Sequence, residues 1–235
     1  MMKTIVEFKN VTKAYGVGEH KLLAADNISF SIQEGEFVVI LGPSGAGKST
    51  LLNLLGGMDF ATSGEIRIDG QNIVGYKDDK LTEYRAKNVG FVFQFYNLIP
   101  TLTALENVVL TKDVVKNALD AKGVLQSVGL GDHFDQFPSQ LSGGEQQRVS
   151  IARAICKDPT MLLCDEPTGA LDSETGIVIL SLLQQMSKER NKTVIIVTHN
   201  AALAQAADKI IKIKNGKIKQ VIINDTPLAV SEVNW

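Results

Sequence analysis

The chain has 235 residues, of which 44% are hydrophobic and 21% are charged, an ordinary composition for a globular protein with one large domain. Its 24 basic and 26 acidic residues give a formal net charge of −2, so no overall field favours nucleic acid and we expect no nucleic-acid partner. No apolar run approaches the roughly 18 residues that cross a bilayer, and Glu7 and Lys9 lie where a signal peptide would be apolar. We therefore expect a chain that is neither secreted nor membrane-spanning.

The first predicted elements are two strands, at residues 4–8 and 27–32. The second of them alternates polar and apolar residues, which is typical of a half-buried strand. Residues 15–18 read as a loop with one aromatic residue, Tyr15. On local grounds alone, a single tyrosine in a loop is more often a packing residue than a binding residue.

Residues 42–50 are predicted to form a phosphate-binding turn. They follow a short, β-branched apolar run at residues 37–41, which reads as a buried strand, and they lead into a helix that stops at Gly56. In this context the pattern G-x-x-x-x-G-K-[ST] binds nucleotide phosphate, because glycines let backbone N–H groups surround an anion. Lys48 can reach the β- and γ-phosphates, and the Ser49 hydroxyl can bind Mg²⁺. The nucleotide-binding residues predicted here are Gly42, Ser44, Gly45, Ala46, Gly47, Lys48, Ser49 and Thr50.

Three later predicted strands end in polar side chains. Residues 89–93 precede Gln94, residues 160–164 precede Asp165 and Glu166, and residues 193–197 precede Thr198 and His199. Gln94 alone could simply cap the sheet, and a lone histidine is usually structural. The carboxyl ends of parallel strands meet at one edge of a sheet, however, so we expect these groups to lie together. Asp165 can then hold Mg²⁺, and Glu166 can polarise an attacking water.

Residues 95–152 are expected to form a helical lobe inserted into the α/β core. Helical patterns begin near Leu102 and Leu119, and nothing in this segment resembles a strand. Its last part carries Ser142, Gly143, Gly144 and Glu145. Ser142 and Glu145 have the spacing of a capping box, so a well-capped helix explains them structurally. Two glycines in a first helical turn cost roughly 1 kcal/mol each relative to alanine, which favours a functional role for their exposed N–H groups.

The rest of the chain contains a helix, a hairpin and a tail. Asp172 is predicted to cap a helix at residues 173–190. Asn215 and Gly216 form a strong hairpin signal between residues 209–214 and 217–223, and the tail at residues 224–235 is expected to be poorly determined. We expect one domain over residues 1–235, with a core at about 1–94 and 153–223.

Taken together and in this order, these residues resemble the ATPase subunit of an ATP-binding-cassette (ABC) transporter. The resemblance covers nearly the whole chain, from about Ile5 to Ile223, and implies an α/β fold: a P-loop NTPase core with a mostly parallel sheet, an N-terminal antiparallel β portion and an inserted α-helical lobe. It places Tyr15 where the family has an adenine-stacking aromatic residue, which reverses the local interpretation of this tyrosine. The family signature is represented by Leu141 to Glu145.

The resemblance implies ATP and Mg²⁺ as cofactors and ATP hydrolysis as the activity. Glu166 and His199 would be catalytic, and Ser49, Gln94 and Asp165 would hold Mg²⁺. Two cassettes would pair head to tail in the presence of ATP. In that homodimer Ser142, Gly143, Gly144 and Glu145 would contact the ATP of the partner subunit, and Asp172 would lie in the dimer loop.

Several motifs are closest to the branch of macrolide-export, lipoprotein-release and cell-division ABC ATPases. That branch implies an integral-membrane permease with few spans and a large extracytoplasmic domain, docked near Gln94 and the apolar segment at residues 95–105. The chain would then be cytoplasmic and peripheral on the inner face of the cell membrane, where it would drive export of a peptide, drug or lipid-like substrate. The alternative is an ATPase of a cell-wall or sensor signalling complex that moves no substrate. Two residues depart from the family: Glu145, where glutamine is commoner, and Asn200, where aspartate is usual.

Overall fold

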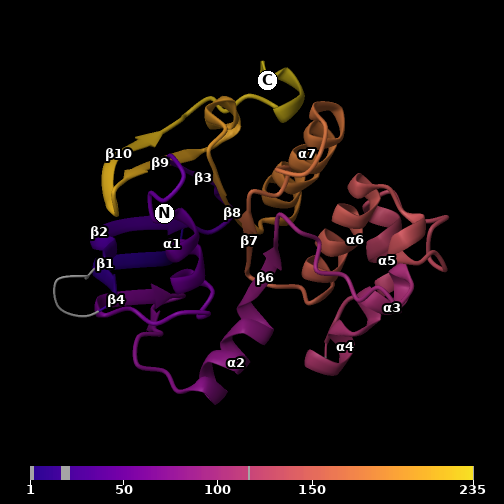
Figure 1. Cartoon of the computed structure of the whole chain (residues 1–235), viewed down its shortest axis with the longest axis horizontal. Helices are drawn as coiled ribbons and strands as arrows, with labels where there is room; N and C mark the ends of the chain where they lie inside the picture. Colours follow the sequence, from indigo (N-terminus) through magenta and orange to yellow (C-terminus); the bar gives the residue numbers. More distant parts are fainter. Residues whose placement is uncertain (1–2, 17–21, 116, 235) are drawn as a thin grey trace.

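The computed structural model describes residues 3–16, 22–115 and 117–234. Val17 and Gly18, the last two residues of the predicted loop, lie outside the described residues. Two sheets and a group of helices make up the fold (Figure 1). The strands form the left and middle of this view, and the helical lobe lies on the right.

The larger sheet is mostly parallel and provides the frame for the site. Its strands are β3 (Phe37–Leu41), β6 (Val89–Val92), β7 (Met161–Asp165), β8 (Thr193–Thr198), β9 (Lys209–Lys214) and β10 (Lys217–Ile223), in the spatial order β10-β9-β3-β8-β7-β6. Only the β9–β10 hairpin is antiparallel, as the Asn215-Gly216 turn predicted. The strands β3, β8, β7 and β6 are therefore neighbours that all end at the same edge.

The smaller sheet is antiparallel and lies toward the N-terminus. It contains β1 (Thr4–Tyr15), β2 (Leu22–Gln33), β4 (Ser63–Ile68) and β5 (Gln71–Asn72), in the order β2-β1-β4-β5. The prediction that the first strand ends near Phe8 and that Tyr15 lies in a loop is wrong. Irregular register, with Asn10 at φ 50°, lets the polar second half of β1 continue its pairing with β2. Tyr15 is the last residue of that strand.

The helices are α1 (Lys48–Leu55), α2 (Asp78–Asn88), α3 (Ala104–Val109), α4 (Thr111–Val114), α5 (Ala121–Ser127), α6 (Gly143–Cys156) and α7 (Ser173–Arg190), with short 3₁₀ turns at Pro138–Gln140, Ala201–Ala206 and Val230–Glu232. The sequence did not predict α2. Only Leu81 and Tyr84 of this helix are buried, so it has almost no apolar period to detect. The helices α3 to α6 form the lobe expected from residues 95–152.

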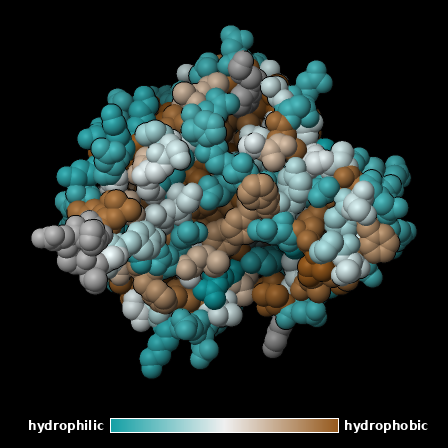
Figure 2. Space-filling model, viewed as in Figure 1, coloured by the Kyte–Doolittle hydropathy of each residue, from teal (hydrophilic) through white to brown (hydrophobic). Residues whose placement is uncertain are grey.

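The core is divided between the two faces of the larger sheet. Alternate residues of β3 point to opposite faces, and all five are buried because both faces are covered. Val38 and Ile40 pack with α1 and the smaller sheet, whereas Phe37, Val39 and Leu41 pack with α6, α7 and the lobe. On the face shown in Figure 2, hydrophobic side chains gather over the middle of the molecule and the outer rim is largely polar.

The C-terminal segment is well packed, so the prediction of a poorly determined tail is wrong for its described residues. Val230 and Val233 are buried in the core. The buried side chain of Gln184 on α7 donates a hydrogen bond to the carbonyl oxygen of Leu228 and accepts one from the N–H of Val230. The sequence of this short segment has no apolar periodicity, so it gave no indication of this packing. No helix of the described part of the chain is long and apolar enough to cross a membrane.

Candidate nucleotide-binding and hydrolytic site

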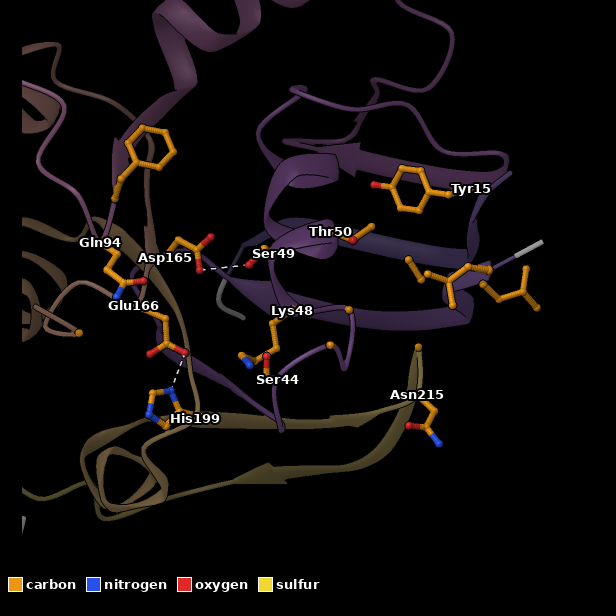
Figure 3. A pocket seen from close by; sticks show the side chains of 18 of the residues that line it. Tyr15, Ser44, Lys48, Ser49, Thr50, Gln94, Asp165, Glu166, His199 and Asn215 are labelled. Carbon is orange, nitrogen blue, oxygen red and sulfur yellow. Dashed lines mark hydrogen bonds and ion pairs between the residues drawn. The ribbon is translucent and has the colours of Figure 1, made fainter. Parts of the chain in front are cut away.

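A cavity of about 1200 Å³ opens at the carboxyl edge of β3, β8, β7 and β6. It brings together most of the residues that the sequence singled out (Figure 3). The predicted residues that line it are Tyr15, Ser44, Gly45, Gly47, Lys48, Ser49, Thr50, Gln94, Asp165, Glu166 and His199. They come from six separate elements or the turns that follow them, so the convergence expected at one sheet edge is present.

The turn at residues 42–50 has the backbone geometry of an anion cradle. Gly45 and Gly47 have φ angles of 73° and 100°, which residues with a side chain rarely adopt. A Cβ at Gly47 would also collide with the carbonyl oxygen of Ala24 on β2. Nζ of Lys48 is 2.9 Å from the carbonyl oxygen of Gly42 and donates a hydrogen bond to it. The turn therefore carries a buried cation beside the N-terminal amides of α1.

Ser49 and Asp165 form the part of the site that fits a divalent cation. Oγ of Ser49 donates a hydrogen bond to Oδ1 of Asp165 over 3.2 Å. Burial raises the pKa of Asp165 above its ordinary value, and the adjacent charge of Glu166 acts in the same direction, although the Ser49 hydroxyl and Lys48 oppose them. Oxygen donors of this kind suit Mg²⁺. No cluster of three or more His, Cys, Asp or Glu side chains among the described residues could hold a metal by itself, so phosphate oxygens would have to complete the coordination.

Glu166 is held rigidly at the centre of the cavity edge. Its backbone has φ 45°, and its N–H donates to the carbonyl oxygen of Val197. Oε2 accepts a hydrogen bond from Oγ1 of Thr198 over 2.9 Å, and Oε1 lies 2.9 Å from Nδ1 of His199. The sequence placed Thr198 at the end of its strand but not in this role. The two contacts orient a carboxylate toward the cavity, which is the arrangement that a general base requires.

Tyr15 lies at the mouth of the cavity and belongs to a small polar group. Its hydroxyl donates to Oδ2 of Asp59 over 2.6 Å. Nζ of Lys13 pairs with the same carboxylate and lies 4.7 Å from the centre of the Tyr15 ring. Desolvation and the bond to Asp59 raise the pKa of Tyr15. Asp59 and Lys13 thus fix an aromatic ring that is 40% exposed, and no motif in the sequence pointed to them.

Two backbone segments that the sequence analysis did not assign to the site also line the cavity. They are residues 22–24 on β2 and the turn Asn215–Gly216. The N–H of Gly216 donates to the carbonyl oxygen of Ala46, and its own carbonyl oxygen accepts from the N–H of Asp26. The hairpin turn is therefore attached to the phosphate-binding turn. The Asn-Gly pair signalled the turn, but only the tertiary structure shows where the turn lies.

The residues Ser142, Gly143, Gly144 and Glu145 do not line this cavity. Ser142 caps α6, and its capping box with Glu145 is present as predicted. A Cβ at Gly144 would collide with Cγ2 of Thr175 on α7, so close helix packing supplies a structural reason for this glycine. Asp172 likewise caps α7, with Oδ1 accepting a hydrogen bond from the N–H of Thr175. The structure thus places the second predicted group of binding residues on the lobe, apart from the first.

Gln147 on α6 connects the lobe to two strand ends of the site. Its side chain is fully buried, and Nε2 donates to the carbonyl oxygens of Phe93 and Pro167, over 3.2 Å and 2.7 Å. Phe93 immediately precedes Gln94, and Pro167 immediately follows Glu166. No sequence pattern singled out Gln147, which is one of four consecutive polar residues, 145–148, in an amphipathic helix.

A P-loop, a carboxylate pair and a histidine around one cavity define a P-loop nucleoside triphosphatase. The family model described as ABC transporter matches residues 25–169. The chain belongs to this family and is an ABC-type ATPase.

Relatives and solved structures agree with this assignment. The chain is 47% identical over 223 residues to an uncharacterized ABC transporter ATP-binding protein of Methanocaldococcus jannaschii, covering 93% of this chain and 99% of that protein. It is 44% identical to a macrolide export ATP-binding/permease protein, MacB, of Aggregatibacter actinomycetemcomitans, covering 94% of this chain but 34% of that protein. A dimeric post-hydrolysis structure of the M. jannaschii cassette MJ0796, bound to ADP and Pi, is 44% identical with a TM-score of 0.84, over 93% of this chain and 98% of that one. These comparisons confirm the predicted fold class and the resemblance to the ABC family.

Proposed function

We propose that this protein is the ATP-hydrolysing subunit of a membrane transporter, that it works as a pair of identical chains, and that it drives a separate permease. The observation that carries the proposal is the separation of two groups of binding residues. The P-loop, Glu166 and His199 share one cavity, whereas the group that begins at Ser142 lies elsewhere on the same chain. Head-to-tail pairing of two chains would bring the two groups together around one nucleotide.

Within one chain the residues would divide the work as follows. Lys48 and the N–H groups of the P-loop would bind the β- and γ-phosphates. Ser49 and Asp165, with Gln94, would hold Mg²⁺, which would neutralise developing charge on the phosphates. Glu166 would orient and deprotonate the attacking water, and His199 would stabilise the γ-phosphoryl group during transfer. Tyr15 would stack on the adenine.

The second chain would complete the site. The Ser142 hydroxyl and the N–H groups at the start of α6 would bind the γ-phosphate of the ATP held by the first chain. Hydrolysis would remove the phosphate that bridges the two chains and let them separate. Asp172 would lie at the loop between them. The dimeric structures of MJ0796 support this arrangement by similarity.

The permease would dock on the segment that follows Gln94. Phe95 and Ile99 are 72% and 40% exposed in this segment. Leu98, in contrast, packs against the core, so it is unsuitable as a docking residue. The MacB relatives are ATP-binding/permease proteins by name, and the chain spans about a third of their length. We infer a permease with few spans and a large extracytoplasmic domain, and hence a cytoplasmic location on the inner face of the membrane.

Trapping the ATP-bound pair tests the two-chain site. In the Glu166→Gln variant the basic carboxylate is lost, but the P-loop and Ser49 remain. We expect this variant to run as a dimer in ATP and as a monomer in ADP on size-exclusion chromatography. Adding Ser142→Arg should abolish the dimer by blocking the second half of the site. A Glu166→Gln protein that binds ATP, cannot hydrolyse it and stays monomeric would refute the two-chain site.

Identification of the membrane protein that co-purifies with this chain tests the permease assignment. Once it is identified, Ile99→Asp should abolish the stimulation of hydrolysis by that partner and spare the basal rate, because Ile99 lies outside the cavity lining. Ile223→Asp is a matched control, because Ile223 is 58% exposed on β10, away from this segment. Equal stimulation of Ile99→Asp and of the control would exclude docking at Ile99. Copurification of a membrane protein without any transported substrate would favour the signalling alternative.

A further inference from the structure

The segment before α6 contains a contact that the proposed function does not use. Nε2 of His133 lies 3.2 Å from Oε1 of Glu145. Both side chains are about one-quarter exposed. Glu145 is the residue at which this chain has a carboxylate and the family more often has an uncharged amide. The contact therefore joins the imidazole ring of His133 to the residue at which the signature of this chain, Leu141 to Glu145, departs from the commoner family sequence.

Glu145 in turn holds Ser142 through its other oxygen. Oε2 accepts hydrogen bonds from both the N–H and the hydroxyl of Ser142, each over 2.8 Å. These bonds, led by the one from the backbone N–H, lower the pKa of Glu145, and the nearby charges of His133 and Arg148 contribute in the same direction. Glu145 is consequently a carboxylate at neutral pH. His133, Glu145 and Ser142 form one continuous chain of contacts.

A carboxylate at this position creates an electrostatic problem for the proposed pairing. The start of α6 would face the γ-phosphate of the partner's ATP, and like charges at close range repel. The helix N-terminus and the serine hydroxyl attract the phosphate, but the Glu145 charge opposes them. A cation on the far side of the carboxylate would offset this charge and keep Oε1 turned away from the phosphate.

We propose that His133 is a positioning residue for the ATP-dependent pairing of two chains, and that it acts through Glu145. When its ring carries a proton, it balances the Glu145 charge and strengthens pairing. When the ring is neutral, the carboxylate is left uncompensated and pairing weakens. This inference rests on the proposed two-chain site and adds to it a residue and a pH dependence.

The geometry assigns the effect to one ring atom. Nδ1 of His133 is buried and has no hydrogen-bond partner among the described residues, so Nε2 is the ring nitrogen that contacts Glu145, and the proton that charges the ring is added at Nδ1. Because Nε2 faces a carboxylate oxygen, it carries hydrogen in both protonation states. The neutral ring then donates an ordinary hydrogen bond, and the charged ring donates a charge-assisted one that is about twice as strong. Histidine side chains change state between about pH 5 and pH 8.

Other charged groups near this pair are the same in every variant of the test. On α6 the charged neighbour is Arg148, and Asp132 and Asp135 flank His133 in the sequence. Lys122 on α5 lies over the ring of Phe134, 5.8 Å from its centre. The helix α3 packs on this segment through backbone bonds, and its Glu106 is occupied in capping Thr103. The comparison between variants therefore isolates the His133 proton.

The test measures the dissociation constant of the ATP-bound dimer by analytical ultracentrifugation. All variants carry Glu166→Gln, so that hydrolysis does not intrude, and each is measured at about pH 6 and about pH 8. Three further changes separate the charges: His133→Arg keeps a cation, His133→Gln keeps only a neutral donor, and Glu145→Gln removes the carboxylate. All four proteins contain the same His199 and bind the same nucleotide, so any effect of pH on these groups is common to them and cancels in the comparison.

With His133 and Glu145 both present, we expect the dissociation constant of the dimer to rise about three- to tenfold from pH 6 to pH 8, which is the scale of two weak ion pairs. The His133→Arg and Glu145→Gln proteins should have a low dissociation constant for the dimer at both pH values. The His133→Gln protein should have a high one at both. Thermal unfolding of each variant checks that the fold is intact. The same pH dependence in all four proteins would overturn the role of His133. Monomers in ATP in every protein at both pH values would refute the two-chain site itself, and this inference with it.

Discussion

Oε1 of Glu166 lies 2.9 Å from Nδ1 of His199, although the two residues are 33 positions apart. The contact exists because β7 and β8 are adjacent parallel strands that end at the same level, with Asp165 paired to Val197. Since Nδ1 faces a carboxylate oxygen, it carries hydrogen and donates it. Nε2 is then the ring atom left to face a nucleotide, in a side chain that is 71% exposed.

Replacing His199 should slow hydrolysis with little effect on binding. We expect His199→Ala to lower kcat on the order of 10²-fold, the scale of one lost acid–base or charge-stabilising group. The affinity for ATP should change little, because the P-loop and Lys48 are untouched. Single-turnover hydrolysis and a separate nucleotide-binding titration measure the two quantities.

His199→Gln is the matched control for this prediction, since its amide can still form hydrogen bonds toward the cavity. It should retain more activity than His199→Ala. If both variants hydrolyse ATP at the unmodified rate, His199 is a structural residue that only steadies Glu166. A parallel loss of binding and rate would instead indicate that the cavity has collapsed.

Tyr15 is expected to determine part of the nucleotide affinity through its ring. Tyr15→Ala should weaken ATP binding by about 1 kcal/mol or somewhat more, which is the scale of a lost aromatic contact. Tyr15→Trp should be tolerated. Tyr15→Phe should cost less than Tyr15→Ala, because only the bond to Asp59 is lost. Isothermal titration calorimetry with ATP measures the order of affinities among these variants. Unchanged affinity in Tyr15→Ala would show that Tyr15 is a packing residue and does not stack on the adenine.

Asp165 is expected to lower the stability of the nucleotide-free protein, although hydrolysis requires it. Burial raises its pKa, and a carboxyl group whose pKa is raised by folding destabilises the folded state at any pH where it is ionised. Asp165→Asn should therefore raise the melting temperature at neutral pH by a few degrees, a single-charge effect for a chain of this size. Hydrolysis with Mg²⁺ should fall on the order of 10²-fold.

A lower melting temperature in Asp165→Asn, measured without nucleotide, would contradict the first part of this prediction. Normal hydrolysis would contradict the second part and remove Asp165 from the metal site. Glu174→Gln on α7 is a control that neutralises an acidic residue outside the cavity lining. It should leave both quantities close to those of the unmodified protein.

The buried amide of Gln147 should contribute measurably to folding. Gln147→Leu has a similar volume but leaves the carbonyl oxygens of Phe93 and Pro167 without their donor. We expect the free energy of unfolding to fall by roughly 1 to 3 kcal/mol, the cost of buried polar groups left unpaired. Denaturant unfolding measures this loss. Gln185→Leu is the control: among the described residues the Gln185 side chain bonds only to the exposed Glu189, so its loss should cost less than about 0.5 kcal/mol.

The sequence predicted the parts of the site whose chemistry is carried by short, consecutive patterns. The P-loop has a fixed spacing, and Asp165 and Glu166 follow an uninterrupted apolar strand, so local rules were sufficient. Asp59 and Lys13 could not be found in this way. Asp59 lies in the loop between α1 and β4, 44 positions from Tyr15, and Lys13 lies two positions before Tyr15 on β1. The group forms only in the tertiary structure, and single charged residues in such positions carry no pattern.

The errors in the fold have a similar physical origin. The second half of β1 is polar and irregular, and α2 buries only two side chains, so neither has the apolar period that sequence rules detect. The C-terminal tail is ordered because Gln184, far away in the sequence, provides hydrogen bonds for its backbone. In each case tertiary contacts decide a structure that local composition leaves open.

The single amide of Gln147 has a mechanical consequence. Because Nε2 bonds to carbonyl oxygens on both sides of the cavity edge, any tilt of α6 pulls on the chain before Gln94 and on the chain after Glu166 at once. One side-chain nitrogen of Gln147 thus links α6 to both of these backbone segments. A displacement of α6 is therefore passed to both strand ends through one side chain, in addition to the β6–β7 pairing that already joins them, so the lobe is coupled to Gln94 and to Glu166 together.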